Sequence, residues 1–79
     1  MNYAESDLPV TLQEAEMLTL ADGSVVRFET NAEAKDIMIN DSWTPAVTLF
    51  PGCEYTLESG GQQYKIVAQM EAAVEVSKL

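Results

Sequence analysis

The sequence has no histidine, one cysteine and only four basic residues among its 79. Without histidine, the Ser-His and Cys-His pairs that activate a nucleophile cannot form. A single cysteine excludes an internal disulfide, and the usual zinc and iron ligand sets cannot be assembled around it. We therefore expect no enzyme, no metal site and no cofactor, and a chain without a disulfide is typical of a reducing compartment.

Long apolar runs are missing too. The longest uninterrupted ones are a few residues, whereas a membrane-spanning helix needs about 20. The first five residues, Met1 to Glu5, lack the basic start of a secretory signal. We therefore expect a soluble protein located in the cytoplasm of the host cell, with no membrane partner.

Positive charge is scarce and negative charge is abundant. Thirteen carboxylates outnumber Arg27, Lys35, Lys65 and Lys78, and the net charge is −9. Phosphate binding needs clustered Lys or Arg, so direct nucleic-acid binding is excluded, and anionic membranes are disfavoured for the same reason. A protein with a basic surface is the partner that this charge favours.

A chain of this length predicts a single small domain whose folding buries roughly 60% of the surface exposed by the unfolded chain. Its hydrophobic content of 47% is ordinary for a globular protein. Residues 1–7 are acidic and aperiodic, which predicts a flexible leader before one β domain over residues 8–79. Such a small domain leaves no room for the deep pocket that a hydrolase with paired carboxylates needs.

The clearest structural signal is a central hairpin. Residues 53–58 alternate apolar and polar side chains, and residues 62–70 do the same on the return. Gly60-Gly61 supplies the reversal between them, and Pro51-Gly52 suits a type II turn before them. Cys53 shares the apolar face of its strand, so we expect a buried core thiol.

A second hairpin is predicted around Asp22-Gly23, which is preferred type I′ chemistry between two apolar runs. The run over 17–20 leads into this turn and the run over 25–29 leaves it. Residues 30–35 then break the alternation. We expect a crossover there, with a single helical turn capped by Thr30 or Asn31.

Three further segments complete the expected fold. Thr11 and Glu14 have capping-box spacing, which predicts a short helical turn over 12–16, unless this segment is already extended. Residues 36–43 have strand character, and residues 71–79 alternate like a strand, with a helix as the alternative. These signals together predict an all-β fold, a small antiparallel sandwich or partly open barrel of five to seven short strands, with room for one helical turn.

The outward carboxylates are the candidate binding residues. They attract a basic groove as a row of phosphates would, although a solvated surface or protection of strand edges also explains them. A calcium site at Asp36, Asn40 and Asp41 would lack the EF-hand spacing with its central glycine. The candidates are Glu29, Asp36, Asp41, Glu54, Glu58, Glu71 and Glu75.

Trp43 is the remaining candidate for partner binding. One interpretation places it at one end of the core. In the other, Trp43 and Met38 are exposed on the face opposite Ile37 and Ile39, where they make an apolar anchor ringed by carboxylates, the usual composition of a protein-binding hot spot.

Two functions follow as hypotheses. In size, acidity, lack of catalytic apparatus and expected location the chain is similar to small phage-encoded or mobile-element inhibitors, including anti-CRISPR proteins and other nucleic-acid mimics. This resemblance covers composition, and it implies an inhibitor that occludes the site of a basic, nucleic-acid-handling protein. The alternative is a structural β-domain that self-assembles or decorates a larger particle, pairing residues 62–70 across a sheet edge.

Overall fold

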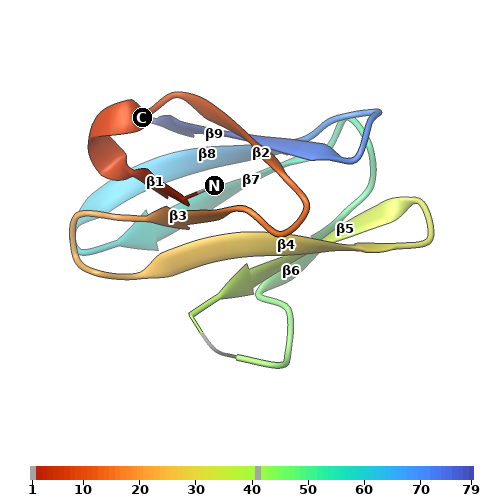
Figure 1. The fold of residues 1–79 in the computed structure, drawn as a ribbon, viewed down its shortest axis with the longest axis horizontal. Helices are drawn as coiled ribbons and strands as arrows, with labels where there is room; N and C mark the ends of the chain where they lie inside the picture. Colours follow the sequence, from red (N-terminus) through yellow and green to blue (C-terminus); the bar gives the residue numbers. More distant parts are fainter. Residues whose placement is uncertain (1, 41) are drawn as a thin grey trace.

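The computed structural model describes residues 2–40 and 42–79, which form nine strands and one 3₁₀ turn, η1 (Glu5–Asp7) (Figure 1). The all-β prediction is confirmed. The strands outnumber the expected five to seven because the N-terminal segments are extended as well. They are β1 (Asn2–Ala4), β2 (Val10–Gln13), β3 (Met17–Thr19), β4 (Val25–Asn31), β5 (Ala34–Ile39), β6 (Val47–Leu49), β7 (Glu54–Ser59), β8 (Gln62–Ala68) and β9 (Ala73–Lys78).

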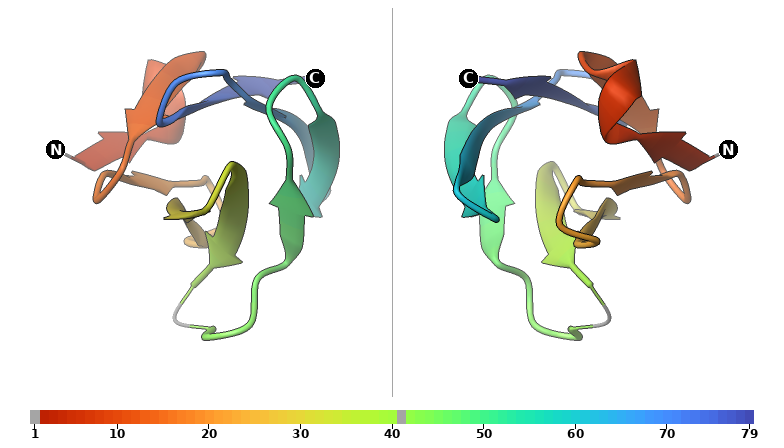
Figure 2. Two further views of the ribbon diagram at one scale, coloured as in Figure 1. Left: turned by 90° about the vertical axis from the view of Figure 1, so that its right-hand side faces the viewer. Right: turned by 90° about the vertical axis from the view of Figure 1, so that its left-hand side faces the viewer.

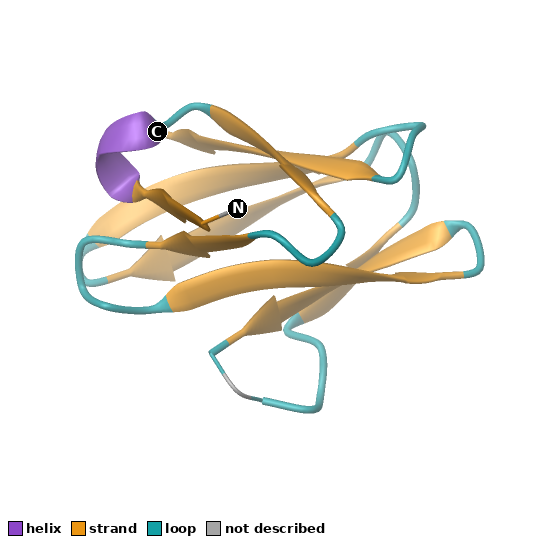
Figure 3. Ribbon diagram, in the orientation of Figure 1, coloured by secondary structure: helices purple, strands orange, loops and turns teal. Residues whose placement is uncertain are grey.

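The strands form two sheets that lie face to face. The five-stranded sheet has the order β1-β3-β4-β5-β6, and the four-stranded sheet has the order β2-β9-β8-β7. Neighbouring strands are antiparallel except β1 and β3, which are parallel. The chain passes between the sheets three times, through η1 and the turn between β2 and β3 at one margin and through the turn from Phe50 to Cys53 at the other (Figures 2 and 3). The result is a sandwich whose two faces are separate surfaces.

The core between the sheets consists of the inward member of each alternating pair. Strands that bury one face place every second side chain inward, and the buried residues follow this period along β2, β4, β8 and β9. The largest fully buried side chains are Tyr64, Phe28, Leu12, Leu18, Ile37, Ile66, Val26, Val74 and Val76. This core fixes which residues of each strand face solvent.

The central hairpin forms as predicted. Strands β7 and β8 pair from Glu54 opposite Val67 to Ser59 opposite Gln62. Gly60 and Gly61 both have positive φ, as a two-residue type I′ turn requires. A Cβ on Gly60 would lie 2.8 Å from the Cβ of Asp22, so this turn also packs closely against the loop between β3 and β4.

The hairpin of β3 and β4 is confirmed, with Leu18 opposite Val26, but its turn differs from the predicted type I′. Gly23 donates to the carbonyl of Leu20 at 2.9 Å, and Leu20 donates to the carbonyl of Ser24 at 2.8 Å. Of the loop residues only Gly23 has positive φ, whereas a type I′ turn needs two such residues. The connection is therefore a three-residue loop with glycine in the left-handed position.

The N-terminal expectations need correction. Residues 2–7 form β1 and η1 where the sequence suggested a loose leader, because β1 finds a partner in β3. The helical turn over 12–16 does not form, and the extended alternative is the one observed, since β2 pairs with β9 from Val10 to Gln13. Pairing with a strand whose residues lie 60 to 66 positions further along the chain overrides the local capping signal.

The crossover predicted over residues 30–35 is also wrong. Strands β4 and β5 form a tight hairpin in which Asn31 is opposite Ala34. Ala32 takes the left-handed conformation, with φ of 57°, in the two-residue turn. A non-glycine residue rarely adopts this conformation, so nothing in the local sequence marked the turn.

The C-terminal strand is confirmed, because β9 runs antiparallel to both β8 and β2. This arrangement contradicts self-assembly through residues 62–70, since β8 lies inside its sheet, between β7 and β9. Cys53 is exposed and not a core thiol, because it lies in the turn before the β7 ladder begins at Glu54. Regular alternation does not yet apply at that position.

The left-handed conformation of Ala32 generates the first prediction. A Cβ in this region costs about 1 kcal/mol relative to glycine, so Ala32→Gly should raise the free energy of unfolding by about 1 kcal/mol. Urea denaturation would show a higher midpoint with an unchanged slope. Ala34→Gly is the control, and it should lower stability because Ala34 is buried in β5. A loss of stability in Ala32→Gly would contradict the left-handed conformation of Ala32.

Candidate acidic interface

The outer face of the four-stranded sheet brings three predicted carboxylates together. Glu54 and Glu58 lie on β7, and Glu75 lies on β9. Glu54 and Glu75 are both register partners of Val67, one on each side of β8. Since neighbouring strands lie about 4.8 Å apart, the backbones of Glu54 and Glu75 are separated by about 10 Å. We call Glu54, Glu58 and Glu75 the acidic face.

One cation shares this face. Lys65 of β8 lies 3.5 Å from the carboxylate of Glu54, and both side chains are well exposed. Exposed ion pairs of this kind contribute little to stability. In the part of the chain that the structure describes, the carboxylates of Glu58 and Glu75 have no hydrogen-bond or ion-pair partner. The acidic face therefore keeps negative charge that no protein group neutralises.

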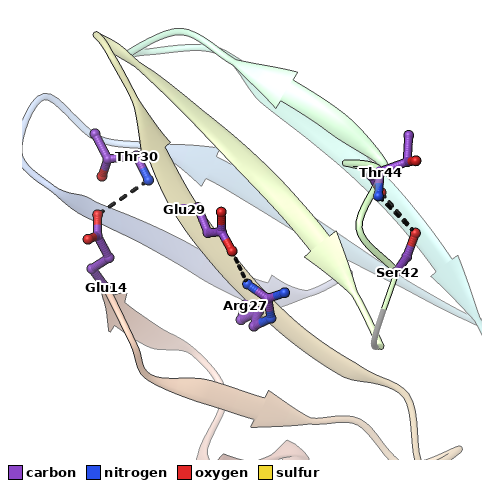
Figure 4. A network of polar contacts seen from close by, with 6 residues as sticks. All are labelled: Glu14, Arg27, Glu29, Thr30, Ser42 and Thr44. Atoms are coloured by element: carbon purple, nitrogen blue, oxygen red, sulfur yellow. Dashed lines mark hydrogen bonds and ion pairs between the residues drawn. The ribbon is translucent and has the colours of Figure 1, made fainter.

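The outer face of the five-stranded sheet carries two other predicted carboxylates, and both have partners. Glu29 and Asp36 are opposite each other on β4 and β5. Glu29 forms an ion pair with Arg27 at 2.7 Å (Figure 4). Asp36 accepts a hydrogen bond from the Thr48 hydroxyl at 2.8 Å and a longer one from the Asn31 amide at 3.4 Å. This face is less available to an outside cation.

Glu71 is exposed in the loop between β8 and β9, and Asp41 falls outside the described residues. The predicted carboxylates that the structure describes thus divide between two opposite faces and a loop, and do not form one surface. The turn between β2 and β3 also reaches β4, because the Glu14 carboxylate accepts from the Thr30 amide at 3.3 Å (Figure 4).

Trp43 does not close the core. It is 94% exposed, in the loop between β5 and β6, whereas Met38 is only 4% exposed. The expected exposed anchor of Trp43 and Met38 is therefore wrong for Met38, because this side chain is buried although it lies on the outward side of β5. The Ser42 hydroxyl accepts from the Thr44 amide at 3.2 Å and donates to its carbonyl at 3.0 Å, which fixes the loop beside Trp43 (Figure 4).

A polar network that the sequence did not reveal lies at the opposite end of the sandwich from the turn between β4 and β5. Glu5 of η1 accepts hydrogen bonds from the buried Tyr64 hydroxyl and from the Ala21 amide at 2.8 Å. Its second oxygen lies 3.1 Å from the Lys78 ammonium. Glu5 and Tyr64 are 59 residues apart, so only the fold could disclose this contact. The network holds η1 against both sheets.

The neighbouring turn carries a second carboxylate in the same region. Asp22 accepts hydrogen bonds from the Ser59 hydroxyl and from the Ser24 amide at 2.9 Å. The Ser59 hydroxyl also lies 3.1 Å from that of Ser24. These contacts tie the loop between β3 and β4 to the end of β7, next to the close approach of Gly60.

The electrostatics of this network favour fixed protonation states. The hydrogen bond from Tyr64 and then that from Ala21 lower the pKa of Glu5, and the bond from Ser59 lowers the pKa of Asp22. Burial and then the hydrogen bond to Glu5 raise the pKa of Tyr64 to about 12. Each shift moves the pKa of its group further from pH 7, whereas a group that transfers protons at neutral pH needs a pKa close to 7. The network is suited to holding structure.

The described residues enclose no pocket, and no three His, Cys, Asp or Glu side chains among them gather as metal ligands. The Asn40 side chain, one oxygen of the calcium site considered above, accepts a hydrogen bond from the Val25 amide at 2.9 Å. No helix in residues 2–40 or 42–79 is long and apolar enough to span a bilayer.

No protein-family model, curated protein or solved structure matches this chain. A function is therefore inferred from the surface of the described structure.

The Glu5 network generates the second prediction. Tyr64→Phe keeps the buried ring and removes one donor from Glu5, so the free energy of unfolding should fall by about 1 kcal/mol at neutral pH. The raised pKa of Tyr64 contributes stability that is complete below pH 10 and is lost as pH rises through about 12. Urea denaturation measured at several pH values from 10 to about 12 should show a falling free energy of unfolding in the wild type, and this fall should be absent in Tyr64→Phe.

Tyr55→Phe is the matched control, because the described structure gives the Tyr55 hydroxyl no hydrogen bond. The pKa of Glu5 is lowered, so its effect on stability has the opposite pH dependence. The stability that Glu5 contributes is present above its ordinary pKa of 4.5 and is lost as the pH falls through its lowered pKa. Equal behaviour of the two tyrosine variants would show that the network does not hold the N-terminal segment.

Trp43 gives the third prediction. Because its side chain is almost fully exposed, Trp43→Ala should change the free energy of unfolding by less than about 0.5 kcal/mol. Phe28→Ala, at a buried position, should cost about 3 to 5 kcal/mol. Denaturation midpoints of both variants measure the contrast, and a large loss in Trp43→Ala would return Trp43 to the core.

Proposed function

We propose that this protein is a non-enzymatic inhibitor that binds a basic, nucleic-acid-handling protein and occludes its nucleic-acid site with the acidic face. The observation that supports this proposal is the uncompensated charge of Glu58 and Glu75, which a rigid sheet presents beside Glu54. Proteins that handle nucleic acids carry clustered Lys and Arg, the complement of such a face. The protein then acts as a nucleic-acid mimic of the anti-CRISPR or phage-inhibitor kind.

The distribution of the cations adds support. Arg27, Lys65 and Lys78 each form an ion pair with a carboxylate of the same chain. Lys35, the fourth, is the one buried charged residue among those described. The field outside the protein is therefore negative, which speeds encounter with a basic partner and repels free nucleic acid. Such an encounter weakens as salt screens the charges.

A self-assembling β-domain is the competing function. It would form oligomers through a sheet edge and depend little on salt, so sizing at micromolar concentration tests it directly. A monomer at low and high salt supports the inhibitor, and a salt-independent oligomer overturns it.

Capture from host extract provides the fourth prediction. The tagged protein should recover one basic, nucleic-acid-handling protein at low salt, and high salt or added DNA should displace it. Mass spectrometry identifies the captured protein. Recovery of the bait alone, or of assembly proteins that ignore salt, would contradict the proposal.

A matched pair of variants locates the interface. One double variant combines Glu58→Lys with Glu75→Lys. The other combines Glu33→Lys with Glu71→Lys. Both change the net charge by the same amount, and all four residues are exposed. Within the described structure, none of these carboxylates has a polar partner to lose. The first pair should weaken binding of the captured protein about tenfold more than the second. Equal losses would show that charge acts without a defined face.

A further inference from the structure

β7 is the longest edge strand of the sandwich. It has six residues, whereas the other edge strands β1, β2 and β6 have three, four and three. Pro9 precedes β2, and β6 lies between Pro45 and Pro51. Proline and short length both limit strand addition at an edge. β7 is longer and contains no proline, although Pro51 also precedes it, and Figure 2 shows β7 at the outer margin of the molecule.

The backbone of β7 presents unpaired groups at this margin. Ala68 donates to the carbonyl of Cys53 at 3.0 Å, so residue 53 faces β8. Hydrogen bonding alternates along an antiparallel strand, and therefore Glu54, Thr56 and Glu58 direct their amides and carbonyls away from β8. β8 is the one hydrogen-bonded neighbour of β7 in the described sheet. Three pairs of backbone donors and acceptors are thus available at this edge, and two of the three residues that carry them, Glu54 and Glu58, belong to the acidic face.

The charges of β7 select what can pair with this edge. If two copies paired antiparallel about Thr56, Glu54 of each copy would lie opposite Glu58 of the other. Like charges directly opposite each other destabilise a strand pair, whereas opposite charges stabilise it by roughly 0.2–1 kcal/mol per pair. The edge therefore disfavours a second copy of this chain and favours an extended segment with Lys or Arg at alternate positions.

We propose that β7 binds an extended, Lys- or Arg-rich segment of the partner as an added strand of the four-stranded sheet. The backbone of Glu54, Thr56 and Glu58 supplies the hydrogen bonds, as in other complexes formed by strand addition, and the two carboxylates contact the basic side chains. This inference rests on the proposed function, since it assigns the contact that the inhibitor makes with its basic partner.

A synthetic peptide of alternating Lys and Thr, blocked at both ends and as long as β7, tests the inference on the intact protein. Calorimetry at low salt should detect binding, and NMR should show shifted and exchange-protected amides at Glu54, Thr56 and Glu58. Thr56→Pro should weaken this binding at least about tenfold, because it removes an outward amide without changing any charge or the ladder with β8. A peptide with Glu in place of Lys should not bind.

A second peptide guards against a folding defect in Thr56→Pro. It has the same sequence but carries a methyl group on the backbone nitrogen of every Lys, the residues that would lie opposite Glu54, Thr56 and Glu58 in an antiparallel pair. It therefore has the same charge but cannot donate the ladder hydrogen bonds. It should bind the wild-type protein at least about tenfold more weakly than the first peptide. Equal affinity of the two peptides, shifts confined to other strands, or no binding of the first peptide would each overturn strand addition. These outcomes leave the capture experiment unaffected, so the two proposals fail separately.

Discussion

The structure depends on one constraint, the burial of every second side chain between two sheets. A chain of 79 residues without a disulfide has only this small core to stabilise it. Because Tyr64, Ile66 and Val76 must face inward, the alternating positions on β7, β8 and β9 must face solvent. Shifting β7 by one residue against β8 would bury Glu54 and Glu58, which the core cannot accept. The placement of the acidic face thus follows from the packing of the apolar one.

The two ends of the chain are secured to this core by charge and hydrogen bonding. Glu5 contacts Tyr64, Ala21 and Lys78, so one carboxylate joins η1, the loop after β3 and the last strand. The net charge of the chain is −9, so an unpaired Glu5 would add to the repulsion between carboxylates. Its contacts compensate that negative charge. Carboxylates therefore have two roles here. Glu5 and Asp22 stabilise the fold, and Glu58 and Glu75 stay free for a partner.

The sequence was sufficient where local chemistry decides structure. Gly60-Gly61 and the alternation beside it predicted the central hairpin and its outward glutamates. It was insufficient where distant pairing decides. The capping spacing of Thr11 and Glu14 gave way to pairing with β9, and the turn at Ala32 uses a conformation that alanine rarely adopts. Distant pairing also decides the site. Alternation along each strand predicted that the carboxylates point outward, but only the order of strands in the two sheets shows that Glu75 and Glu29 lie on different faces.

The proposed partner binds the outer face and edge of the four-stranded sheet. Hydrogen exchange of the isolated protein and of its complex with the captured partner tests it most directly. New protection is expected in β7, at Glu54, Thr56 and Glu58, with β4 and β5 unchanged. Protection confined to β4 and β5, or to the loop of Trp43, would contradict it and move the interface to the opposite sheet.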